Sequence, residues 1–239
     1  MIPDSLPTLS AGAHHPGGGR ACVMEYVSLL AGEEWSDRPS CTHPVLASMA
    51  QEVNDSLPDD ERYQLVPLIG RLFGTSVAHL SERDQHVLAV RLAVWCARQV
   101  LPLAPESGPA ERAIDAAEGW HEGRVSTEEC RLAAAYAAHA ASDAAASDAA
   151  YAAAHAAANA ANAAFAAAYA AYAASDAANA AANAAYADDA YDAATQETAD
   201  LIGLLAGLID EFDRLTGRTE HREVSPDELR SLADAVARP

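Results

Sequence analysis

Lysine is absent from this sequence, so its 15 basic residues are all arginines, against 35 aspartates and glutamates. The formal net charge is −20 and the isoelectric point is near 4.6. Nucleic-acid binding needs basic patches that displace counterions from phosphates, and an anionic membrane surface attracts cations for the same reason. We therefore expect neither a nucleic acid nor a membrane as a partner.

Cysteine is also scarce, with four widely spaced residues. Residues 1–20 contain proline, glycine and histidine but lack the apolar segment of a signal peptide. No run of about 20 strongly apolar residues, the length needed for a membrane span, is found. These absences predict a cytoplasmic protein with free thiols.

Familiar catalytic patterns are missing, including a glycine-rich phosphate loop, G-x-S-x-G and H-E-x-x-H. The densest group of metal-capable residues is Cys22, Glu25, Cys41 and His43. Structural zinc needs four ligands, commonly in closely spaced pairs, and here one Cys-x-His follows a lone cysteine. We interpret the group as buried thiols and a loop histidine, and expect no cofactor, metal or enzymatic activity. A polar or catalytic network of Glu25 and Asp37 with His43 is the alternative.

Glycine and proline are both absent from residues 124–202, and alanine dominates residues 133–194. The other residues of this alanine tract recur about every 3.6 positions, which is a helical period. The tract therefore predicts an all-α protein. A single helix would be about 120 Å long at 1.5 Å per residue. Two or three closely packed helices, broken at the Ser-Asp pairs 142–143, 147–148 or 175–176, are the alternative.

The recurring polar and aromatic residues would share one face of the tract, opposite a face of alanine. Such a stripe is ordinarily a solvated side, but tyrosine is also typical of protein interfaces. No arginine occurs between Leu132 and Asp213, so this face would favour a basic partner. The candidate partner-binding residues are Tyr136, His139, Asp143, Tyr151, His155, Tyr169, Tyr172 and Asp176.

Composition divides the chain into four regions. Residues 1–20 read as a flexible leader, 21–106 as an N-terminal helical domain, 107–217 as the alanine-rich helical domain, and 218–239 as a tail with a short helix. Helix-start signals occur at Pro44, Ser81, Ser126 and Ser225. Gly203 and Gly207 are four residues apart and predict a tight helix contact.

Three segments in this order resemble a known family. They are residues 91–98 (RLAVWCAR), residues 111–123 (ERAIDAAEGWHEG, with its Trp-x-x-Gly element) and the alanine tract. The chain resembles the Imm-5-like family of alanine-rich, all-helical immunity proteins of actinobacteria over roughly residues 82–200. The resemblance implies a non-catalytic protein that neutralises a toxin by binding it. An Asp-x-Arg pair expected before residue 113 is not evident, so no binding residue is transferred.

Three functions follow, in order of preference. The first is an immunity-type protein that binds and occludes a cognate toxin, presumed basic, or another protein. The second is a structural protein that forms homo-oligomers through the alanine face. The third is an enzyme or metal site at the N-terminal Cys/Glu/His group.

Overall fold

Helices form nearly all the regular structure of the protein. The computed structural model describes residues 9–103, 107–144, 148–166, 168–186 and 191–237. Within these ranges no strand is present, and Leu9 and Ala21 form one isolated parallel bridge. The all-α prediction is confirmed.

The elements follow one another with short connections. The N-terminal part contains α1 (Val23–Ala31), α2 (Pro44–Ser56), η1 (Arg62–Leu68), α3 (Ile69–Leu72), α4 (Glu82–Val100) and η2 (Leu101–Leu103). The rest contains α5 (Ser107–His121), α6 (Thr127–Ala144), α7 (Asp148–Ala163), α8 (Ala168–Tyr186), α9 (Tyr191–Thr216) and α10 (Pro226–Ala237).

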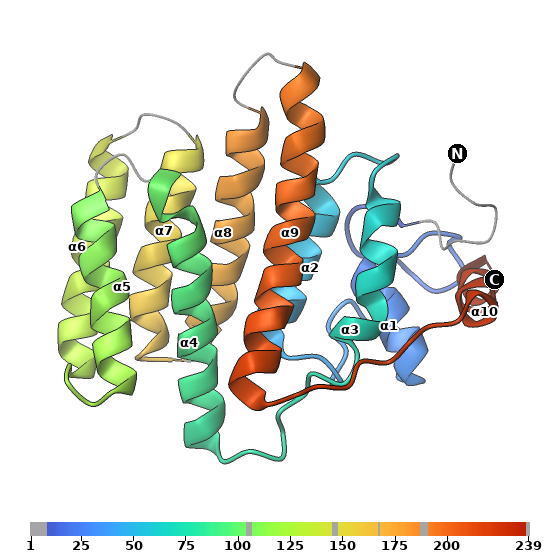
Figure 1. Cartoon of the computed structure of the whole chain (residues 1–239), viewed down its shortest axis with the longest axis horizontal. Coiled ribbons are helices and arrows are strands. Elements are labelled where there is room, and N and C mark those ends of the chain that lie inside the picture. Colours follow the sequence, from blue (N-terminus) through green and yellow to red (C-terminus); the bar gives the residue numbers. More distant parts are fainter. Residues whose placement is uncertain (1–8, 104–106, 145–147, 167, 187–190, 238–239) are drawn as a thin grey trace.

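The long helices α4 to α9 run up and down the molecule side by side (Figure 1). Helix α6 lies at one end of the bundle, against α5 and α7. The short helices α1, α3 and α10 lie at the other end (Figure 1). Helix α7 contacts α4, α5, α6 and α8, so it lies in the interior of the bundle.

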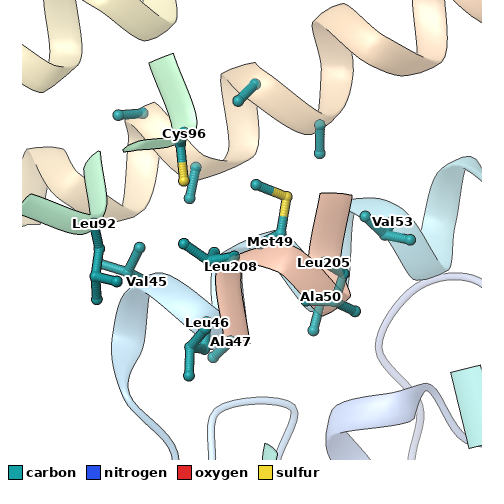
Figure 2. Close-up of a cluster of buried hydrophobic side chains, with 14 of the residues drawn as sticks. Val45, Leu46, Ala47, Met49, Ala50, Val53, Leu92, Cys96, Leu205 and Leu208 are labelled. Atoms are coloured by element: carbon teal, nitrogen blue, oxygen red, sulfur yellow. The ribbon is translucent and has the colours of Figure 1, made fainter. Parts of the chain in front are cut away.

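Helix α2 supplies much of the large-residue core. Val45, Leu46, Met49 and Val53 are almost completely buried, at 0–1% exposure. Figure 2 shows them in one cluster with Leu92 and Cys96 of α4 and Leu205 and Leu208 of α9. This core therefore joins the N-terminal helices to the end of the chain.

The alanine tract is divided among α6, α7, α8 and the start of α9. The single-helix alternative is therefore wrong. The α7–α8 connection contains Ala164 and Phe165, whose N–H groups donate to the carbonyls of Ala161 and Asn162. No Ser-Asp pair lies there, and Ser175 and Asp176 lie inside α8. Residues 145–147, which include Ser147 of the predicted pair 147–148, are outside the described residues.

Most alanines of α7 and α8 are buried between helices. Ala156, Ala157, Ala173, Ala174 and Ala177 each have 0% exposure. Alanine favours helix and its small side chain lets helices approach closely. The tract thus forms a thin, densely helical core instead of an extended rod.

Local helix signals are confirmed at several ends. Ser81, Ser126 and Ser225 each accept the backbone N–H three residues later, at 3.2–3.3 Å. Between α2 and α4 the chain forms the 3₁₀ helix η1, which contains Pro67, a residue without a backbone N–H, and then the short helix α3. Helix α5 continues through Gly119 and ends at His121.

Residues 9–20 form specific contacts with later parts of the chain. Ser10 N–H donates to the Ala21 carbonyl at 2.9 Å, and Gly12 N–H donates to Asp55 at 2.7 Å. Residues 1–8 are outside the described residues. The regions proposed as separate helical domains also share one continuous hydrophobic core.

The segment Glu82–Leu103 is long and apolar enough to cross a membrane by length and composition alone, which the sequence reading did not expect. Half of its most apolar window is buried inside the bundle, as is usual for a central core helix. This feature is therefore weak evidence for a membrane span.

Candidate protein-binding surface

Large exposed apolar side chains gather on the alanine-rich helices. Of those in the described part of the chain, only Tyr63, at 41%, lies elsewhere. The others are Leu132 (54%), Tyr136 (70%), Tyr151 (48%), Phe165 (61%) and Tyr172 (58%). Exposed aromatic side chains in a group are typical of interaction sites. We call this region the α6–α8 surface.

The outer side of α6 contributes its most exposed part. Tyr136 and His139 lie three residues apart and are both exposed. The guanidinium of Arg131 lies over the ring of Phe165, 5.9 Å from its centroid, which links α6 to the α7–α8 turn. Asp143, also predicted for this stripe, has a side chain outside the described residues.

Helices α7 and α8 share a polar band. The rings of Tyr151 and His155 are 4.3 Å apart between centroids. Asn159 Nδ2 donates to Asp176 Oδ2 at 2.6 Å across the two helices. Desolvation raises the pKa of Asp176, although the bond from Asn159 and the charge of His155 oppose this. The Nε2 atom of His155 is buried and has no hydrogen-bond partner among the described residues.

The polar band continues from α8 onto α2. Ser175 Oγ donates to Glu52 Oε2 at 2.9 Å. Desolvation raises the pKa of Glu52, and the charges of Asp55 and Asp176 act in the same direction. Sequence reasoning missed Glu52, because nothing in the local sequence of α2 signals that this carboxylate will meet α8.

Tyr172 lies at a cavity of about 570 Å³ between α8 and the start of α2. His43, Ser48 and Gln51 from the α2 side also line this cavity. The preceding tyrosine of the stripe, Tyr169, meets Tyr172 edge-on with centroids 6.0 Å apart. Tyr169 is only partly exposed, so its main contact is with the ring of Tyr172 and little of it is available to a partner.

The predicted stripe is therefore divided between three places. Tyr151, His155 and Asp176 are brought together, Tyr172 lies beside a cavity next to α2, and Tyr136 and His139 lie on α6. The stripe kept its phase through the α7–α8 turn because both helices turn their alanines inward and their polar residues outward.

The alternative network of Glu25 and Asp37 with His43 does not form. Glu25 does not meet His43; it accepts from the backbone N–H groups of His14 and Cys22 at 2.6 and 2.7 Å. Its carboxylate also meets His14 Nδ1 at 3.0 Å and accepts from Trp35 Nε1 at 3.1 Å. Sequence reasoning missed His14 and Trp35 as partners of this buried carboxylate.

The remaining members of that group have separate roles. Asp37 accepts from Gln51 Nε2 at 3.1 Å, and His43 caps α2. Burial raises the pKa of the Cys22 thiol to about 12 and also raises the pKa of Cys41. A raised pKa disfavours the thiolate needed for nucleophilic attack or metal binding. No group of three or more metal-capable side chains occurs within the described ranges.

Comparisons with known proteins place the chain in a family. No curated protein and no solved structure matches it. A family model described as "Imm-5 like putative immunity protein" matches residues 78–204, which is more than half of the chain. The matched part runs from just before α4 into α9 and includes the whole α6–α8 surface. The chain therefore belongs to the Imm-5 like family.

Proposed function

We propose that this protein is an immunity-type protein that binds a cognate toxin and occludes it with the α6–α8 surface. The observation that carries the proposal is the concentration of exposed aromatic side chains on helices of the family-matched region. Family membership implies a protein partner in general. The site and the mode of binding are our inference.

The chemistry of the surface favours a partner with basic and apolar groups. Tyrosine buries a large area at small entropic cost, so exposed tyrosines are suited to act as anchors. Asp176 and Glu52 belong to the polar band that runs from α7 across α8 to α2, and no arginine follows Arg131 until Arg214. A lysine- or arginine-bearing loop of the toxin would complement these carboxylates.

The test is capture of the protein encoded next to this gene, measured by titration calorimetry with purified components. Tyr136→Ala and Tyr151→Ala should each weaken binding at least tenfold, because truncated anchors cost about 2 kcal/mol or more. Tyr63→Ala is the matched control, since Tyr63 is an exposed tyrosine outside the surface. Equal binding by all three variants would reject the surface.

These tyrosines isolate binding better than charge reversal at Asp143, Asp148 and Asp176. Asp176 is partly buried and accepts a bond from Asn159, so arginine there would disturb the α7–α8 packing. The side chains of Asp143 and Asp148 are outside the described residues. Loss of capture in such a triple variant would not separate binding from folding.

Assembly of copies is a second function, favoured by the exposed α6 face. The alanine faces of α7 and α8 are buried within the chain, so they do not offer the oligomer contact expected from the sequence. Leu132 and Tyr136 on α6 would have to supply it. Light scattering at high concentration tests this function, and a strict monomer would reject it.

A further inference from the structure

A second cavity, of about 470 Å³, lies between the start of α4 and the end of α9. Its volume is within the range of about 300–1,000 Å³ typical of small-molecule sites. Val77, Leu88 and Phe212 are buried in its wall, and Leu80, Val87 and Leu215 line it while partly exposed. The cavity is thus apolar over much of its lining.

Arg91 on α4 also lines this cavity and has no counterion. Every other arginine that is at least partly buried in the described chain is paired. Arg62 pairs with Asp59, Arg71 with Asp210 at 2.6 Å, and Arg218 with Asp213 at 2.9 Å. Arg91 makes no ion pair or hydrogen bond within the described residues. With 35 acidic residues in the chain, this isolation does not reflect a shortage of carboxylates.

The other charged groups at the cavity are already engaged. Arg218 is held by Asp213 and donates to the carbonyls of Arg71 and Phe73 at 2.8 and 3.2 Å. Asp84 accepts from Ser81 Oγ at 2.6 Å at the exposed rim. The carboxylate of Asp84 would repel a dianion such as phosphate more strongly than a monoanion. His79 also lines the cavity, from an exposed position. Arg91 is therefore the permanently charged group at the cavity whose donors are unoccupied.

We propose that this cavity binds a small monocarboxylate with an apolar body. The carboxylate would receive charge-assisted hydrogen bonds from the Arg91 guanidinium, a pairing that suits its planar donors. The apolar body would displace water from the wall formed by Val77, Leu88 and Phe212. The site is separate from the α6–α8 surface and does not depend on toxin binding.

Titration calorimetry with butanoate, hexanoate and octanoate at pH 7 tests the proposal on the full chain. We expect affinity to rise about fourfold per added methylene until the cavity is filled. The matching alcohols should bind at least tenfold more weakly, because they lack the charged acceptor for Arg91. No binding by any of the carboxylates would overturn the proposal.

Two variants locate the binding. Arg91→Gln should lower carboxylate affinity at least tenfold while leaving the weak alcohol binding unchanged. Leu215→Trp places a larger side chain in the cavity and should remove binding of both the carboxylates and the alcohols. This second variant still tests the site if Arg91→Gln does not fold. Circular dichroism checks the fold of each variant. Unchanged carboxylate binding in a folded Arg91→Gln protein, or in the Leu215→Trp protein, would refute the site.

Discussion

His43 joins three parts of the fold. Its Nδ1 accepts the Val45 N–H at 3.3 Å as the cap of α2, and its own N–H donates to Thr75 Oγ1 at 2.9 Å. Its ring lies 5.6 Å from that of Phe212 on α9. Burial lowers its pKa from 6.5 to about 4, so the folded protein holds it neutral. Protonation would also remove the acceptor that caps the helix.

We expect the free energy of unfolding to fall as the pH drops from 7 to 4. An unfolded His43 binds a proton below pH 6.5 and a folded one only near pH 4. The stabilisation from neutral His43 is therefore complete above pH 6.5 and is lost between pH 6.5 and pH 4. At 1.36 kcal/mol per pKa unit, the loss is about 3 kcal/mol of unfolding free energy. Urea denaturation of the wild type and of His43→Asn measures it, because asparagine can cap without titrating.

Comparing His43→Asn with wild type separates the contribution of His43 to the pH dependence from that of carboxylates with the opposite effect. Asp176 and Glu52 have raised pKa values, so their burial disfavours folding at neutral pH and this penalty disappears as the pH falls. Both are present in wild type and variant alike. His15→Asn changes an exposed histidine and serves as the control. An equal pH dependence in His43→Asn and wild type would contradict the assignment.

The residues at the candidate sites differ in how far the sequence could reveal them. The exposure of Tyr136 and Tyr151 was predictable because a helical period marks the outer face of an alanine helix. The Glu25–His14 and Glu52–Ser175 pairs join distant parts of the chain. Such contacts depend on how the elements pack, and no local spacing encodes that.

The elements show the same division between local and tertiary causes. Starts of helices at Ser81, Ser126 and Ser225 were predictable because a serine hydroxyl satisfies a free backbone N–H locally. The α7–α8 turn was not, since Ala164 and Phe165 lack the backbone preferences of glycine or proline. Helix α7 packs against α4, α5, α6 and α8, and such tertiary contacts are not encoded in local spacing.

Helix α9 contains two glycines, Gly203 and Gly207, that differ in their surroundings. Substituting each one distinguishes the effect of helix propensity from the effect of packing. A Cβ on Gly203 would meet nothing within 4 Å, whereas one on Gly207 would lie 3.1 Å from the Trp95 ring of α4. The sequence prediction of tight contact is therefore correct for Gly207 and wrong for Gly203.

We expect Gly203→Ala to stabilise the protein by about 0.5–1 kcal/mol, because alanine restricts the unfolded chain more. Gly207→Ala should lose that gain, and destabilise by up to about 1–3 kcal/mol if Trp95 cannot shift. Denaturant midpoints of the two variants measure the difference. Equal stabilisation of both would show that the α4–α9 contact has space for a methyl group.

At the scale of the whole molecule, the family-matched region shares one hydrophobic core with helices outside it. Its helices α4, α7 and α8 contact each other, and α2 packs against α8 from outside the matched range. Large side chains fill the core around α2, and alanines fill the other end of the bundle. The stability of the molecule thus depends on two kinds of packing that join at α4 and α8.

The alanine end should tolerate little added volume. Ala157 of α7 is fully buried where α7 is surrounded by neighbouring helices, so Ala157→Leu must push them apart. We expect a loss of about 1–3 kcal/mol, or roughly 2–12 °C in melting temperature for a chain of this size. Ala135→Leu adds the same atoms on the exposed side of α6 and should stay within about 0.5 kcal/mol of wild type. If thermal melts show equal stability for the two variants, the space around Ala157 can hold a larger side chain, and close helix approach does not require alanine there.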